Sequence, residues 1–125
     1  MKILITGATG LLGRSLVKTA LSKGIEINFL STKKSKINCF NKAKGFYWNP
    51  SNGDLDTDCF LGVDIIIHLA GASISKLWTS SYKKLIFSSR VDSTRLLFSS
   101  LKQIGSRHKI KQIISASAVG IYPSD

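Results

Sequence analysis

The sequence predicts an α/β protein of the Rossmann type, with a doubly wound parallel sheet. Three observations support this fold class. A short apolar run leads directly into a glycine-rich turn and then a helical pattern at residues 2–21. A nearly continuous apolar run at residues 64–72 is typical of a parallel strand that is buried on both faces. Strand-like and helix-like segments alternate along the chain, which requires right-handed crossovers and predicts the strand order 3-2-1-4-5.

Length and composition indicate a single domain covering residues 1–125, with 43% hydrophobic residues to build a core. The net charge of +11 favours solubility and attraction to anions, but it does not identify a partner. The sequence contains neither a signal peptide nor an apolar run long enough for a membrane span, so we expect a cytoplasmic protein. Cys39 and Cys59 have no metal-binding spacing, so we expect reduced, buried or half-buried thiols and no metal site.

The first strand and the turn after it carry the functional signal. Residues 2–5 form the strand, and Gly7, Gly10 and Gly13 follow at a spacing of three. We expect Gly7 to allow a tight turn, Gly10 to let backbone N–H groups approach a ligand, and Gly13 to let the helix pack on the strand. The positive end of the helix then faces an anion, most simply the pyrophosphate of a dinucleotide.

The spacing of these glycines excludes one alternative. A nucleotide-triphosphatase loop has four residues between its glycines and then a lysine, whereas five separate Gly7 from Gly13 here and Arg14 follows. A turn that only packs the helix, with no ligand, remains an alternative. Arg14 argues against it, because a cation in the first turn opposes the helix dipole unless an anion is present.

The rest of the first helix and the second strand follow from periodicity and turn residues. Leu12, Leu16 and Ala20 share one helical face, and Gly24 is a plausible C-cap. Residues 25–31 alternate as a strand. The loop of Thr32, Lys33 and Lys34 comes next, where an NAD-specific site would carry an acidic residue for the ribose 2′-hydroxyl. Lysines in that place favour NADP over NAD, although they could also be a solvated surface loop.

The middle of the chain is less regular. Residues 37–44 are expected to be irregular or briefly helical, and residues 45–49 form a short third strand. Residues 49–54 are dense in turn formers, and residues 55–61 predict a brief helix.

The fourth strand, residues 64–72, ends in small residues that would let a flat ring or a sugar lie against the backbone. His68 lies within its apolar run and is predicted to be a core histidine with hydrogen-bond partners rather than a catalytic group. Residues 79–104 predict a long helix with a bend near Ser88 and Ser89, because they contain no glycine or proline. A fifth strand at residues 111–119 becomes small and hydroxylated at its end.

Four motifs in order resemble the extended short-chain dehydrogenase/reductases, in the branch of NAD-dependent epimerase/dehydratase-like "epimerase family proteins". The nucleotide loop is T-G-A-T-G-L-L-G at Thr6–Gly13, and H-L-A-G-A at His68–Ala72 matches the fourth strand. Trp78 and the helix segment S-R-V-D-S-T-R at Ser89–Arg95 are typical of this branch. S-A-S-A-V-G at Ser115–Gly120 matches its fifth strand.

The resemblance implies roles for particular residues. The glycines would contact the pyrophosphate, Arg14 and the loop at Ser31–Lys34 the 2′-phosphate, and Leu69–Gly71 the adenosine and ribose. Ser117 would be the catalytic serine that hydrogen-bonds the substrate oxygen, although it could also be only a small residue at a strand end. The full predicted cofactor-binding set is Thr6, Gly7, Gly10, Leu11, Leu12, Gly13, Arg14, Ser31, Thr32, Lys33, Lys34, Leu69, Ala70 and Gly71.

The resemblance also implies a catalytic tyrosine and lysine, spaced Y-x-x-x-K, beyond the fifth strand. We therefore expect the chain to be the N-terminal half of such a protein, without its C-terminal substrate-binding part, and inactive alone. The complete protein would be an NADP-dependent oxidoreductase or epimerase that transfers hydride on an unidentified sugar-like or carbonyl small molecule. The alternative is a non-catalytic, dinucleotide-binding regulatory module. Nucleic-acid binding is not expected, because no aromatic-studded basic strand or recognition helix accompanies the charge.

Overall fold

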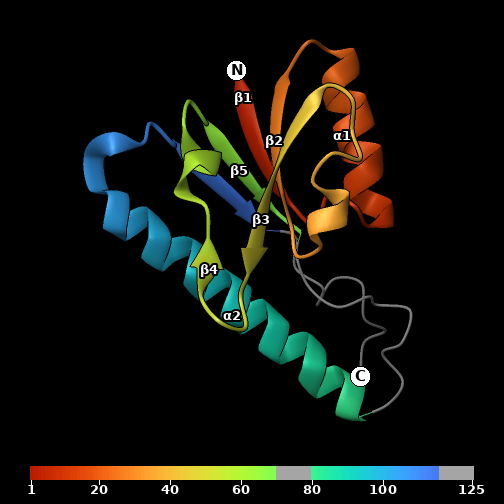
Figure 1. The fold of residues 1–125 in the computed structure, drawn as a ribbon, viewed down its shortest axis with the longest axis vertical. Helices are drawn as coiled ribbons and strands as arrows, with labels where there is room; N and C mark the ends of the chain where they lie inside the picture. Colours follow the sequence, from red (N-terminus) through yellow and green to blue (C-terminus); the bar gives the residue numbers. More distant parts are fainter. Residues whose placement is uncertain (70–79, 116–125) are drawn as a thin grey trace.

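The computed structural model describes residues 1–69 and 80–115, with the backbone alone for residues 80–90 and residue 106. Figure 1 shows the arrangement. The described elements follow one another as β1 (Lys2–Thr6), α1 (Leu11–Ser22), β2 (Glu26–Ser31), the 3₁₀ turn η1 (Lys34–Lys36), β3 (Ala43–Asn49), β4 (Asp54–Leu55), the 3₁₀ turn η2 (Thr57–Phe60), β5 (Ile65–His68), α2 (Ser80–Ile104), the 3₁₀ turn η4 (Gly105–Arg107) and β6 (Gln112–Ser115).

The described strands form one sheet in the order β4-β3-β2-β1-β5-β6. The pairs β3–β2, β2–β1, β1–β5 and β5–β6 are all parallel. The predicted order 3-2-1-4-5 is therefore confirmed for the parallel strands, and the fold is of the Rossmann type.

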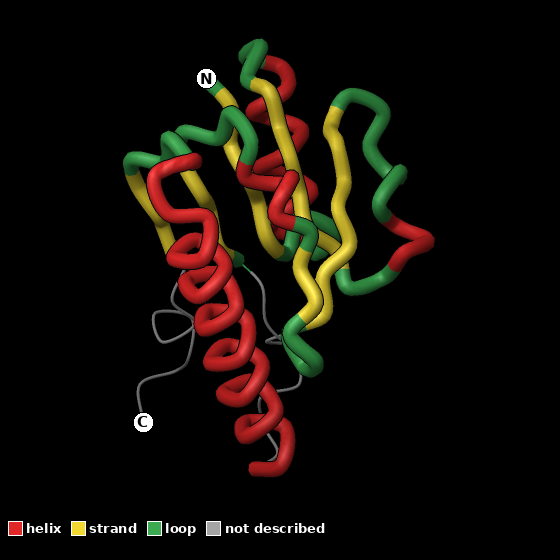
Figure 2. Tube along the Cα trace, turned by 60° about the vertical axis from the view of Figure 1, so that its left-hand side comes forward, coloured by secondary structure: helices red, strands yellow, loops and turns green. Residues whose placement is uncertain are grey.

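The two helices lie on opposite faces of this sheet (Figure 2). On one face, Val17 and Ala20 of α1 pack with Ile5 of β1 and Phe29 of β2. On the other face, α2 supplies Leu97 to a cluster of buried residues from the sheet and η2. That cluster contains Leu4, Leu30, Phe46, Trp48, Cys59, Phe60, Val63, Ile66, Leu97 and Leu101.

The parallel register sets the carboxyl ends of the strands side by side. Thr6 of β1 pairs with Leu30 of β2 and with His68 of β5, and His68 pairs with Ser115 of β6. The glycine loop follows β1 at this same edge. Ligands of open α/β sheets bind at the carboxyl edge of the strands, so the register brings the predicted site residues to the expected place.

The structure refines the prediction for two loops and one helix. The segment predicted as a turn at residues 49–54 opens a hairpin, because Trp48 and Asn49 pair antiparallel with β4. The expected brief helix at residues 55–61 is confirmed as η2, a 3₁₀ helix that covers only Thr57–Phe60 and follows the end of β4. The predicted long helix is confirmed, because α2 runs continuously from Ser80 to Ile104, while the bend expected near Ser88 and Ser89 stays a prediction.

The core face of α1 is also shifted from the prediction. Gly13, Val17 and Ala20 are buried, while Leu12 is 61% exposed. Leu12 was expected on the buried face, but the helix approaches the sheet through Gly13 and so turns Leu12 outward.

A buried polar side chain links β2 to the 3₁₀ turn η2. The Asn28 side-chain amide in β2 is buried and donates a hydrogen bond to the Cys59 carbonyl at 3.0 Å, which meets the polar demand of both groups. Within residues 1–69 and 80–115, no helix combines the length and apolar character that a bilayer crossing requires.

Candidate functional site

The glycine loop turns sharply between β1 and α1. Gly7 has a φ of +73°, a conformation that residues with a side chain rarely adopt. The Gly10 N–H donates to the Gly7 carbonyl at 3.2 Å, and the Arg14 N–H donates to the Gly10 carbonyl at 2.9 Å. The loop thus closes a tight turn and passes directly into the helix, as the sequence predicts.

Gly13 and Gly10 serve different needs. A Cβ on Gly13 would overlap the Gly7 carbonyl oxygen and would lie 2.6 Å from Ala8 Cα, so the packing of α1 on the loop requires glycine there. A Cβ on Gly10 would meet the Gly7 carbonyl oxygen at 3.5 Å, an ordinary van der Waals distance. Gly10 also has an ordinary extended conformation, with φ −75° and ψ 175°. In the part of the chain that the structure describes, neither packing nor backbone conformation therefore requires glycine at position 10.

The mouth of α1 has the features of an anion site. Gly10 is the N-cap and provides no side chain to cap the helix, and the first turn contains no acidic residue. The first N–H groups of a helix have no acceptor within the helix, so the amides of Leu11, Leu12 and Gly13 can bind a ligand. The side chain of Leu11 is 93% exposed and contributes little packing to the core.

Arg14 has two partners within the protein. Its Nε–H donates to the Thr9 carbonyl at 2.9 Å, and its guanidinium carbon lies 5.8 Å from the centroid of the Phe40 ring. These contacts explain in part how a cation is tolerated in the first turn of a helix. The helix-dipole argument for an anion is correspondingly weaker than the sequence alone indicates.

The loop after β2 is shaped by Ser31. The Ser31 hydroxyl donates to the Lys33 carbonyl at 3.2 Å and accepts from the Lys33 N–H at 3.1 Å. Ser31 is buried, whereas Thr32 and Lys33 are exposed. Of the predicted loop residues, Ser31 therefore holds the local turn, and Thr32, Lys33 and Lys34 are exposed to solvent.

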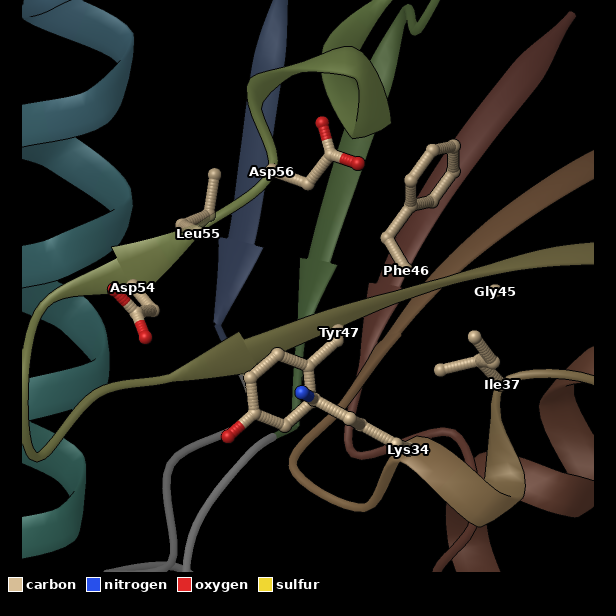
Figure 3. A pocket seen from close by; sticks show the side chains of 8 residues that line it. All are labelled: Lys34, Ile37, Gly45, Phe46, Tyr47, Asp54, Leu55 and Asp56. Atoms are coloured by element: carbon tan, nitrogen blue, oxygen red, sulfur yellow. The ribbon is translucent and has the colours of Figure 1, made fainter.

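Lys34 lies in a separate hollow beside β3 (Figure 3). Its ammonium group is 5.0 Å from the centroid of the Tyr47 ring. The hollow has a volume of about 500 Å³ and is lined by Lys34, Ile37, Gly45, Phe46, Tyr47, Asp54, Leu55 and Asp56. It includes no residue of the glycine loop, and two carboxylates at its wall disfavour an anionic ligand.

A buried hydrogen-bond network joins the end of β1 to the end of β5 and to α2. Thr6 Oγ1 lies 2.7 Å from His68 Nδ1 and accepts from the Leu69 N–H at 2.9 Å. On the other side of the imidazole, Nε2 lies 3.1 Å from Thr94 Oγ1 and 3.5 Å from Ser93 Oγ. His68 is 4% exposed, so the prediction of a core histidine with hydrogen-bond partners is confirmed.

Thr6 and Leu69 belong to the predicted cofactor-binding set, and this network fixes both. The Thr6 side chain is completely buried and is occupied by contacts within the protein. Ala70, Gly71 and Ser117, with Trp78 of the family motif, lie outside the described residues. Ser115, two positions before Ser117, is the last residue of β6.

Sequence reasoning missed two contributors to this region. Phe40 lies in the segment predicted as irregular, and nothing in the residue pattern indicates that its ring contacts Arg14. Thr94 was part of a family motif, but its contact with His68 joins residues 26 positions apart. Contacts of this kind depend on how helices are placed on the sheet, which periodicity does not specify.

The cysteines are unpaired thiols in different surroundings. Cys59 is buried, and this burial, with the nearby charges of Asp56 and Asp58, raises the pKa of its thiol well above the usual value. Cys39 is exposed, which corrects the expectation that both thiols are at least half-buried. Within the described residues, no group of three or more potential metal ligands is brought together.

Comparison with known sequences gives a consistent result. The sequence profile of the NAD dependent epimerase/dehydratase family matches residues 3–125. Epimerase family protein SSP1921 of Staphylococcus saprophyticus is 37% identical over 122 residues, which cover 98% of this chain and 39% of that protein. The chain thus spans about two fifths of the length of such relatives.

Comparison with solved structures supports the same fold. Human epimerase family protein SDR39U1 (isoform 2), crystallised with NADPH, matches with a TM-score of 0.69 and 22% identity, over 100% of this chain and 39% of that chain. A short-chain dehydrogenase/reductase superfamily protein from Agrobacterium tumefaciens with bound NAD matches with a TM-score of 0.67 and 21% identity, over 98% of this chain and 34% of that chain.

Proposed function

We propose, from the premise that this chain belongs to the NAD dependent epimerase/dehydratase family, that it binds a nicotinamide dinucleotide at the mouth of α1. It would be the cofactor-binding part of an oxidoreductase or epimerase acting on a small molecule. The observation that carries the proposal is Gly10, which is exposed and extended at the helix N-cap although no contact among residues 1–69 and 80–115 requires a glycine there. Close approach of a ligand to the backbone accounts for its missing side chain.

The residues present fit the pyrophosphate of such a cofactor. The free amides of Leu11, Leu12 and Gly13 can donate to phosphate oxygens, and the dipole of α1 favours the negative charge. Relatives of the fold bind either form of the cofactor, since the human protein is described with NADPH and the Agrobacterium protein with NAD.

We propose NADP as the preferred form. The carboxyl end of β2 and the loop after it, residues 30–36, contain no Asp or Glu to accept a hydrogen bond from a ribose 2′-hydroxyl. Arg14 and Lys33 are exposed cations, and their side chains suit a 2′-phosphate. Lys34 is a third exposed cation of this loop, and its ammonium group lies 5.0 Å from the centroid of the Tyr47 ring.

The remaining roles follow from the family resemblance. Hydride transfer to or from the nicotinamide ring is the chemistry that the dinucleotide supplies when it is bound. Leu69, Ala70 and Gly71 would line the adenosine and ribose, and Ser117 would orient the substrate oxygen through a hydrogen bond. The 125 residues contain no Y-x-x-x-K sequence, so we expect them to bind dinucleotide without turning over substrate. The non-catalytic regulatory module remains the alternative, and the absence of Y-x-x-x-K from a longer form would favour it.

A fluorescence titration of the chain with NADPH and with NADH tests both parts of the proposal. We expect saturable binding of both, with NADPH the tighter ligand. If neither NADPH nor NADH binds, the assignment of the α1 mouth as the dinucleotide site is refuted. Equal or tighter binding of NADH would refute only the preference for NADP. Measurable turnover of a sugar or carbonyl compound by the chain would contradict the expected lack of activity.

A further inference from the structure

Phe40 is an aromatic residue that joins the hydrophobic core to the cation at the start of α1. Its ring meets the ring of Phe29 edge-on, with centroids 5.0 Å apart and planes at 90°. Phe29 is completely buried in β2. On the other side, the Arg14 guanidinium carbon lies 5.8 Å from the Phe40 centroid, within the range of a cation–π interaction. The Phe40 ring thus packs against buried Phe29 on one side and faces the Arg14 guanidinium on the other.

Gly45 of β3 permits this arrangement. A Cβ on Gly45 would overlap the Ile37 carbonyl oxygen and would lie 2.6 Å from the Cζ atom of Phe29. The chain leaving η1 can therefore lie directly over β3 only because residue 45 has no side chain. The segment that carries Phe40 is held close to the sheet as a result.

The contact also sets the direction of Arg14. Its Nε–H is fixed on the Thr9 carbonyl at 2.9 Å, so the Nη groups remain available on the exposed end of the side chain. The ring of Phe40 belongs to the connection between β2 and β3. Arg14 is therefore tied to the connection that leaves the carboxyl end of β2, the edge of the sheet where a dinucleotide binds in this class of fold.

We propose that Phe40 is a positioning residue for cofactor selectivity: it holds Arg14 where the guanidinium meets the 2′-phosphate of NADP. This inference rests on the proposed function and adds a residue outside the glycine loop and the basic loop. Phe40 acts through Arg14, so its effect falls on NADPH and not on NADH, which lacks the phosphate.

The test compares Phe40→Leu with Phe40→Tyr by titration with NADPH and NADH. Leucine keeps an apolar side chain but removes the π face, and we expect it to weaken NADPH binding about two- to fivefold while NADH binding is unchanged. Tyrosine keeps the ring and should restore NADPH binding. Phe98→Leu is the matched control, because Phe98 is 52% exposed on α2 and far in sequence from the site. Circular dichroism of each variant checks that it is folded.

The double variant Arg14→Leu with Phe40→Leu separates positioning from general packing. If Phe40 acts through Arg14, the two changes together weaken NADPH binding no more than Arg14→Leu alone. Additive losses would overturn the inference, as would an unchanged NADPH affinity in Phe40→Leu or an equal loss for NADPH and NADH. If the unmodified chain binds neither dinucleotide, the proposed function itself fails, which is a different outcome.

Discussion

Replacing Gly13 with alanine adds a methyl group where α1 touches the glycine loop. The new Cβ would overlap the Gly7 carbonyl oxygen and would lie 2.6 Å from Ala8 Cα and 2.9 Å from the Ala8 carbonyl carbon. All three are backbone atoms of a turn that the Gly10 N–H closes on the Gly7 carbonyl, so they cannot rotate away as a side chain would. The helix or the loop must move instead.

The magnitude follows from two opposing effects. Overpacking of this kind costs about 3 kcal/mol, at the upper end of its usual range, because no flexible atom can yield. Alanine is favoured over glycine within a helix by about 1 kcal/mol. The net loss in free energy of unfolding is therefore about 2 kcal/mol, which lowers the melting temperature by about 8 °C for a chain of this size.

Thermal and urea unfolding followed by circular dichroism measure this loss, with Gly10→Ala as the control. The Gly10 variant meets no close contact and should lose at most about 1 kcal/mol, the usual cost of alanine at an N-cap. It should nevertheless weaken NADPH binding by roughly tenfold or more, since hydrogen bonds to a charged group are worth about 1.5–3 kcal/mol. A Gly13→Ala variant as stable as the parent chain would refute the close approach of α1 to the loop.

Two further predictions concern groups outside the site. The Lys2 backbone N–H, at 3.0 Å, and then the Lys109 ammonium, at 3.5 Å, stabilise the Asp64 carboxylate and lower its pKa. The resulting stabilisation of the folded state is fully present above the ordinary carboxyl pKa. It is lost as pH falls through the lower pKa that Asp64 has in the folded chain. Asp64→Asn should therefore be less stable than the parent chain at pH 7, and the difference in free energy of unfolding should narrow below about pH 4. A difference in urea unfolding that does not change with pH would contradict this. Iodoacetamide at pH 8 should modify exposed Cys39 in the folded chain but buried Cys59 only after unfolding. If the folded Cys39→Ser variant, which keeps only Cys59, reacts with iodoacetamide, the prediction that Cys59 is inaccessible is wrong.

The sequence patterns that predicted the fold correctly are those with many repeated signals. The parallel order required only that strands and helices alternate, and each strand carried several apolar residues. The two residues of β4 are too few to show a period, so the turn at residues 49–54 was recognised but the hairpin was not. The helix face was misplaced because Leu12 counted as apolar, whereas contact of Gly13 with the loop decides how the helix is oriented.

Part of the candidate site could be predicted from the sequence for a similar reason. Gly7 and Gly13 have roles that follow from local backbone geometry, and both roles are confirmed by the φ of Gly7 and the close packing at Gly13. The position of Arg14 depends on Phe40, which is distant along the chain and reaches it through the course of the β2–β3 connection. No spacing rule relates the two.

The network of Thr6, His68 and Thr94 has a consequence for how sequences of this kind can diverge. Each of the three comes from a different element, and the imidazole of buried His68 contacts both threonine hydroxyls. An apolar replacement of His68 removes a hydrogen-bonding partner from both threonines, so a change at His68 is expected to be accompanied by changes at Thr6 and Thr94. Aligned relatives that lack the histidine should therefore show coordinated substitutions at the two threonine positions.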